Sequence, residues 1–196
     1  MQKLSDDVEQ YVKNLLGINR MEDLVFHSLE HTIEVVDAAR EIATASNLDP
    51  TEMQVLLVAA WFHDCGYIFT YTGHEDESKR IAGEFLQLYG CSTDFIDKVL
   101  DCIEATRFPQ QEATTIIAAI LCDADLYHFT RPGYPVYERA LRHEFKVFLN
   151  KTYSDREWNQ TNLSVLRNHT YKSDYGAKIL QQFKEVNIHL LEAIQA

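Results

Sequence analysis

The stretch that decides the fold lies at residues 49–66 and reads DPTEMQVLLVAAWFHDCG. It opens with an N-cap aspartate, a proline at the first helical position and a glutamate three residues after the cap, which together predict a helix start. Residues 53–62 are almost wholly apolar, so they predict a helix buried at the centre of the domain. His63 and Asp64 follow, and Gly66 predicts that the helix ends beside this polar pair.

Outside this stretch, apolar residues recur at three- and four-residue steps along most of the chain, which predicts further helices. Their expected ranges are 5–16, 22–46, about 74–89, 92–106, 113–129, 136–149, 155–168 and 173–195. Gly66 and Gly73 bracket an aromatic loop at 67–71, and Ser154 with Glu157 forms a second capping box. We therefore predict an all-α fold, a single bundle of about eight or nine helices.

Composition and charge exclude several classes of function. The chain has 196 residues, of which 46% are hydrophobic, enough for one domain with a sizeable core. Its formal net charge of −12 repels nucleic acids and anionic membranes, and no run of Lys or Arg reverses it, so we expect neither partner. Without an apolar stretch of about 18 residues or a signal sequence, we expect a cytoplasmic protein. We expect four reduced cysteines, Cys65, Cys91, Cys102 and Cys122.

Residues with metal-binding chemistry are spread along the chain. They are His31 in the predicted helix 22–46, the doublet His63 and Asp64, and Asp125. Two imidazoles and two carboxylates form a mixed nitrogen and oxygen set, which suits Mn, Fe, Ni, Co, Zn or Mg better than a thiolate site does. By itself, a His-Asp doublet is more often a hydrogen-bonded pair at a helix end. Here aromatic residues precede it, and a buried aspartate needs a strong partner such as a cation.

The order of these residues resembles the HD-domain superfamily of metal-dependent phosphohydrolases. The pattern of that family is a His on one helix, a His-Asp pair ending another and an Asp on a later helix, and the residues that match it are His31, His63, Asp64 and Asp125. Weaker matches are HEDES at 74–78, ATRFP at 105–109 and the region near Arg142 and Glu144. The resemblance covers residues 22–145, and we expect residues 146–196 to form C-terminal helices packed on this core. The whole chain, 1–196, is then one HD-type domain.

The resemblance implies that a metal-activated water hydrolyses a phosphoester, with one divalent ion held by the four matching residues. Asp64 is expected both to bind the ion and to be essential for catalysis. The implied substrate is a small phosphorylated metabolite or nucleotide, either a phosphomonoester or a cyclic phosphodiester.

Asp125 fits the last family motif better than Asp123 does. Because these two residues are about 200° apart on a helix, only one is expected to face the metal, and Asp123 is expected behind the ligands or facing solvent.

Other residues are expected to flank the ligands. His27 lies four residues before His31, so the two are expected on one helix face. His27 is either the general acid for the leaving oxygen, as in the related cyclic-nucleotide phosphodiesterases, or a structural histidine. His74 is expected to bind substrate, although His74 or Glu104 would be a ligand if two ions were bound. The candidate phosphate-binding arginines are Arg107 and Arg142.

Two other functions fit parts of the sequence. Residues 27–31 read HSLEH, the spacing of an inverted zinc protease in which Glu30 activates water, but this interpretation leaves His63, Asp64 and Asp125 unexplained. A non-catalytic metal and nucleotide sensor of the same fold would keep all four ligand positions. Release of phosphate or of a nucleotide product separates an enzyme from a sensor. The oligomeric state stays open, with a homodimer as one option.

Overall fold

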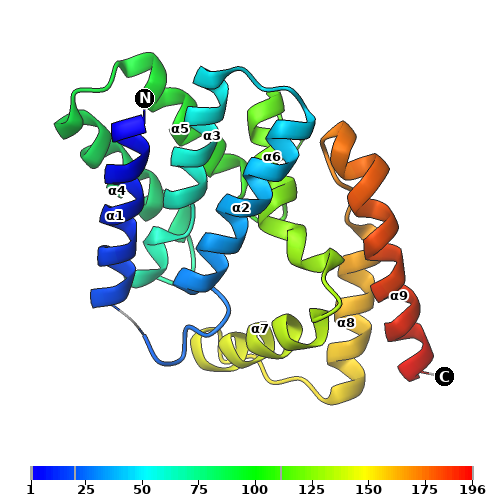
Figure 1. The fold of residues 1–196 in the computed structure, drawn as a ribbon. Helices are drawn as coiled ribbons and strands as arrows, with labels where there is room; N and C mark the ends of the chain where they lie inside the picture. The colour runs from blue at the N-terminus through cyan, green and yellow to red at the C-terminus, as the bar shows by residue number, and fades with distance from the viewer. Residues whose placement is uncertain (1, 20, 111, 196) are drawn as a thin grey trace.

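Nine α-helices make up most of the chain in the computed structural model, which describes residues 2–19, 21–110 and 112–195 (Figure 1). They are α1 (Gln2–Ile18), α2 (Leu29–Ala45), α3 (Pro50–Phe62), α4 (His74–Tyr89), α5 (Thr93–Ala105), α6 (Ile116–Asp125), α7 (Tyr134–Phe148), α8 (Asp155–Asn168) and α9 (Gln181–Gln195). Short 3-10 segments, η1 (Cys65–Ile68) and η2 (Leu126–Thr130), follow α3 and α6, and a π-helical turn, η3 (Gly176–Leu180), precedes α9. These residues include no β-strand, so the predicted all-α fold is confirmed.

The helix α3 is the centre of the core. The side chain of Asp49 accepts hydrogen bonds from the backbone N–H groups of Thr51 and Glu52, and the Glu52 side chain accepts from the N–H of Asp49. This is the predicted capping box. Every residue from Val55 to Phe62 is buried, and α3 contacts α1, α2, α4, α5 and α6. A helix that is apolar on all faces is stable only when other helices surround it in this way.

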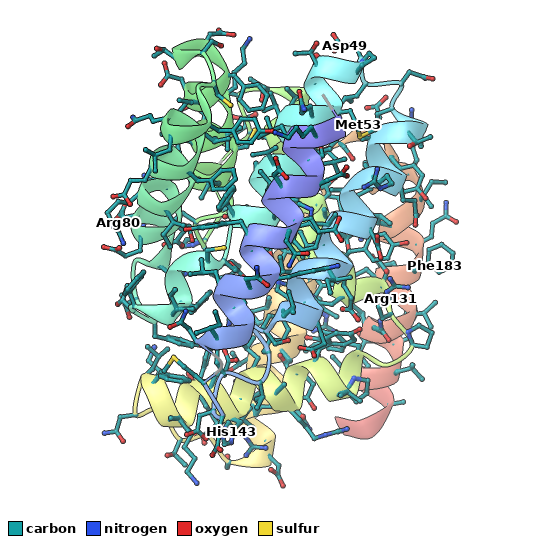
Figure 2. The ribbon with its side chains drawn as sticks, turned by 60° about the vertical axis from the view of Figure 1, so that its left-hand side comes forward. Asp49, Met53, Arg80, Arg131, His143 and Phe183 are labelled. Atoms are coloured by element: carbon teal, nitrogen blue, oxygen red, sulfur yellow. The ribbon has the colours of Figure 1, made fainter. Side chains whose placement is uncertain are left out.

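The helices form two parts that meet near the C-terminal end of α3. In Figure 1, α1 to α6 lie together, and α7 and α8 lie beneath them. In Figure 2, Asp49 at the start of α3 and His143 on α7 lie at opposite ends of the molecule, so α3 runs toward α7. A second hydrophobic cluster joins η2, α7, α8 and α9, and its buried residues are Leu126, Phe129, Tyr134, Leu163, Leu166, Ile188 and Leu191.

The start of α2 differs from the predicted helix 22–46. The helix begins at Leu29 with Ser28 as its N-cap, whose Oγ accepts a hydrogen bond from the N–H of His31 at 3.3 Å. The cap has an extended backbone conformation, which excludes the residues before it from the helix. His27 therefore lies in the preceding loop, and the expectation that His27 and His31 share a helix face is wrong.

The predicted helix 113–129 is also divided. Thr115 is the N-cap of α6, and the α-helix ends at Asp125, where the chain tightens into η2. Asp125 consequently lies at a helix end, like His63 at the end of α3.

No helix within the described residues is long and apolar enough to cross a membrane. The four cysteines are free.

Gly66 allows α4 to approach the segment that follows Asp64. A Cβ atom at position 66 would lie 1.9 Å from the carbonyl oxygen of His74. The N–H of Gly66 donates a hydrogen bond to the Oγ of Ser78 at 2.8 Å. Only glycine fits this close backbone contact, which sets the position of His74 beside Asp64.

We predict that Gly66→Ala lowers the free energy of unfolding by about 1–3 kcal/mol, because backbone atoms must move to admit the methyl group. Gly83→Ala is the control, since an added Cβ on this α4 residue meets nothing within 4 Å. This control is expected to stabilise the protein by up to about 1 kcal/mol. Chemical denaturation measures both values, and a Gly66→Ala variant as stable as the wild type would contradict the packing described.

Candidate metal centre

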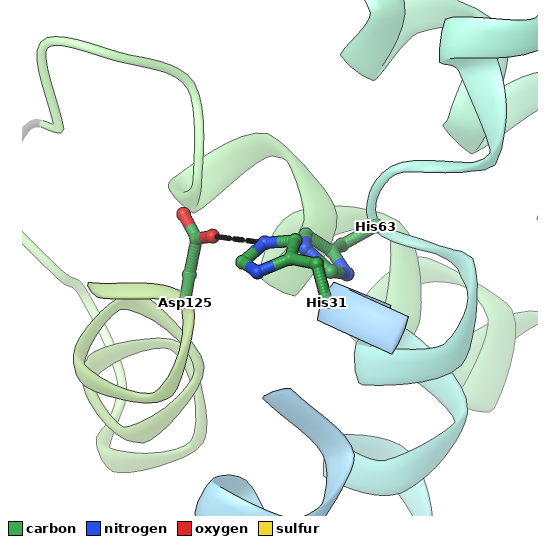
Figure 3. Close-up of side chains that lie close together, drawn as sticks. All are labelled: His31, His63 and Asp125. Carbon is green, nitrogen blue, oxygen red and sulfur yellow. Dashed lines mark ion pairs between the residues drawn. The ribbon is translucent and has the colours of Figure 1, made fainter. Parts of the chain in front are cut away.

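Three helix ends bring four polar side chains together in the interior. His31 is in the first turn of α2, His63 and Asp64 directly follow α3, and Asp125 ends α6. Figure 3 shows the side chains of His31, His63 and Asp125 pointing toward one another from three different helices. His31, His63 and Asp64 are buried, and Asp125 is half-buried.

The ligand atoms of these residues are spaced as around one ion. The Nε2 atom of His31 lies 3.5 Å from Oδ2 of Asp64 and 3.3 Å from Oδ1 of Asp125. The Nε2 atom of His63 lies 3.2 Å and 3.7 Å from the same two oxygens. Ligand atoms at about 2.0–2.2 Å from a metal ion lie roughly 3–3.5 Å from one another. The four side chains therefore fit one coordination shell.

Three atoms at the middle of this set have no hydrogen-bond partner among the described residues: Nε2 of His31, Nε2 of His63 and Oδ2 of Asp64. An unpaired buried polar group costs about 1–3 kcal/mol, and a charged one costs more. The Nδ1 atom of His63 lies 2.8 Å from the carbonyl oxygen of Ala60, to which it can donate, and this leaves the lone pair on Nε2. These observations fit a divalent cation held by His31, His63, Asp64 and Asp125.

The electrostatics of the centre favour positive charge. Burial lowers the pKa of His63, but the carboxylates of Asp64 and Asp125 outweigh burial and hold that pKa well above its usual value. Burial raises the pKa of Asp64, but His63 and His74 outweigh it and hold that pKa well below its usual range. One proton on His63 satisfies only some of the unpaired atoms, whereas a divalent ion satisfies all of them at once.

A second buried carboxylate, Glu144 on α7, holds the loop before α2. Its Oε1 accepts hydrogen bonds from the N–H groups of Phe26 at 2.6 Å and His27 at 3.0 Å. Its Oε2 accepts from Nδ1 of His27 at 2.6 Å and from the Tyr71 hydroxyl at 3.0 Å. Burial raises the pKa of Glu144, but its contacts with His27 and Phe26 lower it below the usual value. The other ring nitrogen of His27, Nε2, lies 3.0 Å from the Tyr67 hydroxyl.

His74 lies on the opposite side of Asp64 from the two histidines. Its Nε2 is 3.4 Å from Oδ1 of Asp64, and its ring stacks on Tyr67 with centroids 3.7 Å apart. Glu104, the alternative second-ion ligand, instead accepts hydrogen bonds from Lys79 at 2.5 Å and Arg107 at 2.6 Å. Of these two candidates, only His74 reaches the centre.

The structure does not bring the two candidate phosphate-binding arginines to the centre. Arg107 donates to Glu104, to Glu75 at 3.1 Å and to Asp76 at 2.9 Å. The other arginine, Arg142, pairs with a carboxylate of α8 at 2.8 Å and donates to a nearby backbone carbonyl. Both guanidinium groups are therefore held by other parts of the protein, outside the cavity described below.

Asp123 is buried but lies away from the ligand cluster. It accepts hydrogen bonds from the N–H groups of Lys172 at 2.7 Å and Ser173 at 2.8 Å, and from the Ser173 hydroxyl at 2.6 Å. A Cβ atom at Gly176 would lie 2.2 Å from its Oδ2. Asp123 thus fixes the segment before α9, and it does not face solvent.

A cavity of about 340 Å³ adjoins the centre and suits a small-molecule ligand. His27, Asp64, His74 and Asp125 line it near the centre, and it continues between η2, α7 and α8. Most of its wall is apolar or aromatic, including Phe26, Tyr67, Phe129, Tyr137, Phe145 and Trp158. Glu30, the water-activating residue of the protease alternative, is exposed on α2 and does not line this cavity.

The HD domain family matches residues 28–130, just over half of the chain. The protein therefore belongs to the HD domain family. Its fold is similar to the crystal structure of a predicted HD superfamily hydrolase from an uncultured Thermotogales bacterium, with a TM-score of 0.61. The two chains are 18% identical, and the match covers 97% of this chain and 88% of the other, so the likeness is one of fold. No curated protein matches the chain.

Proposed function

We propose that the protein is a metal-dependent phosphohydrolase acting on a small phosphorylated metabolite or nucleotide, as a phosphomonoester or cyclic phosphodiester. One observation carries this proposal. Buried atoms of His31, His63 and Asp64 that have no hydrogen-bond partner lie together with the Asp125 carboxylate, next to a cavity large enough for a small ligand. Membership in the HD domain family supports it.

In this proposal His31, His63, Asp64 and Asp125 bind one divalent ion of Mn, Fe, Ni, Co, Zn or Mg. Such an ion supplies positive charge for the phosphate oxygens and lowers the pKa of water. By holding the ion beside the cavity, the four side chains would fix where the phosphate end of the substrate binds. The positive charge matters because the protein carries a net charge of −12, which repels an anionic substrate everywhere else.

His27 then serves as the proton donor to the leaving oxygen. Glu144 accepts a hydrogen bond from Nδ1 of His27, which leaves Nε2, beside Tyr67 at the cavity, as the nitrogen that would pass a proton to the substrate. Glu144 also fixes the orientation of the ring, as a carboxylate does behind many catalytic histidines. His74, whose Nε2 lies 3.4 Å from Oδ1 of Asp64, would hydrogen-bond the phosphate.

The proposal predicts metal-dependent turnover that requires Asp64. The wild-type protein, supplied with each ion in turn, is assayed for phosphate or nucleoside release from nucleoside monophosphates, sugar phosphates, cyclic nucleotides and p-nitrophenyl phosphate. We expect hydrolysis that chelator removes and that Asp64→Asn lowers by at least about a hundredfold. Asp101→Asn is the matched control, because this α5 residue is exposed.

Metal binding without hydrolysis of any substrate would contradict the enzyme proposal and favour a sensor. Hydrolysis of a peptide substrate that survives Asp64→Asn but not Glu30→Gln would instead favour the protease-like use of residues 27–31.

A proton donor is needed most when the leaving group is a poor one. We therefore predict that His27→Gln lowers kcat by about 10²- to 10⁴-fold for an alkyl phosphate, and much less for p-nitrophenyl phosphate. Glu144→Gln is expected to act in the same direction with a smaller effect, because it leaves the imidazole in place. Equal losses on both substrates for His27→Gln would show that His27 is not the proton donor.

A further inference from the structure

The end of the cavity away from the metal centre contains a carboxylate set among aromatic rings. Glu138 on α7 lines this end with Tyr134, Phe145 and Trp158. Its Oε2 accepts hydrogen bonds from the indole N–H of Trp158 and from Nδ2 of Asn162 at 3.0 Å. Asn162 in turn accepts from the Tyr134 hydroxyl at 3.3 Å. These bonds fix the orientation of the carboxylate on the cavity wall.

This end of the cavity is continuous with the metal centre. The ring of His128 stands between the two, with its centroid 6.2 Å from that of His31 and 6.4 Å from that of Tyr134. One ligand can therefore place a phosphate beside Asp64 and its leaving group beside Glu138, since both residues line the same cavity.

No Lys or Arg that the structure describes pairs with Glu138 or lines the cavity. The carboxylates that line it are Asp64, Glu75, Asp125 and Glu138, and its histidines are His27, His74 and His128. Arg142, four residues after Glu138 on α7, donates instead to Asp155 at 2.8 Å and to the carbonyl of Tyr153. No described residue donates a hydrogen bond to Oε1 of Glu138 or forms an ion pair with it. A half-buried carboxylate in these surroundings favours a ligand that brings positive charge or N–H donors.

We propose that this end of the cavity selects substrates whose leaving group has an aromatic or apolar body and carries a hydrogen-bond-donating nitrogen, with Glu138 as the specificity-determining residue. This inference rests on the proposed function, because it places the phosphate at the metal centre. Two sources share this chemistry: an alkylammonium group and the N–H edge of a purine base. Aromatic faces attract cations and stack on bases, and a carboxylate accepts N–H bonds from either.

The same surroundings disfavour other phosphate esters. A simple sugar phosphate, which carries no base or other apolar body, offers only hydroxyl groups to a wall that is mostly apolar, so its polar groups lose water without gaining partners. A second phosphate group on the leaving side approaches Glu75 and Glu138, and like charges repel strongly in a partly desolvated cavity. The inference therefore restricts the substrate to a compact monophosphate.

Two matched pairs of probes test the proposal on the Mn-loaded protein. Tyramine phosphate and 4-ethylphenyl phosphate differ by the ammonium group, and guanosine and inosine monophosphates differ by the 2-amino group. Each pair is assayed with the wild type, with Glu138→Gln and with Glu34→Gln as control. Glu34 on α2 accepts a hydrogen bond from the Tyr137 hydroxyl at 3.0 Å but does not line the cavity.

We expect kcat/KM of the wild type to favour the member with the additional ammonium or amino group in at least one pair by about tenfold or more, the effect of one charge-assisted hydrogen bond. Glu138→Gln should bring the ratio close to one, while Glu34→Gln keeps it. The pair that shows the preference identifies the group that Glu138 binds, either an alkylammonium group or the N–H edge of a purine base. Equal rates within both pairs, or a preference that Glu138→Gln leaves unchanged, overturn the proposal. The wild-type ratios decide alone if Glu138→Gln does not fold.

If no probe is hydrolysed, the proposed function fails, and the specificity is then read from binding. The same pairs are compared by calorimetry on the same metal-loaded proteins. A preference in Kd of about tenfold that Glu138→Gln removes supports the cavity assignment for a binding protein. Equal affinities within both pairs, or no binding of any probe, overturn it.

Discussion

The charge of Asp64 is the constraint that the other features of the centre satisfy. An ionised carboxylate inside a helical bundle needs positive charge beside it, because burial removes the water that would otherwise stabilise it. Asp64 follows the most apolar helix of the chain, α3, whose burial carries the carboxylate into the interior. The start of α2 and the end of α6 bring His31 and Asp125 to the same point. Two imidazoles and a second carboxylate then form a set of atoms that only a cation completes.

The second part of the fold uses a buried carboxylate in a different way. Glu144 is satisfied by donors from the protein itself, and it joins α7 to the loop that carries His27. The two parts of the molecule therefore meet through a charged contact as well as an apolar one, with the cavity between them. In the proposed function this arrangement separates two tasks: α2, α3 and α6 would provide ligands for an ion, whereas α7 and α8 would provide the surface that a leaving group touches. The acidic, aromatic lining on that side would then restrict which phosphate esters fit.

Local signals predicted most of the fold from the sequence. The capping box at Asp49 and the apolar run behind it identified α3 as the core helix, because both depend on neighbouring residues only. His31, His63 and Asp125 were found through the order of a family pattern, and helix geometry alone could not show that their side chains meet. Glu144 lies in a weak family match, but nothing local predicts its role, since it acts on Phe26 and His27 from more than 100 positions away. The same limit misplaced His27 on a helix, because the periodicity continued past the cap at Ser28. The guanidinium charge of Arg107 and Arg142 and their place in weak family matches favour phosphate binding, but the sequence does not reveal the carboxylates that hold them.

The central claim is that the buried cluster is a metal site, and elemental mass spectrometry of the purified protein tests it most directly. The protein is prepared without added metal or chelator and compared with a His63→Gln variant. We predict close to one transition-metal ion per wild-type chain and little in the variant. Two ions per wild-type chain would place His74 among the metal ligands and contradict a single-ion site. No metal in the wild type, even after incubation with excess Mn, Ni, Co, Zn and Mg, would contradict the claim and leave His63 and Asp64 as a structural ion pair.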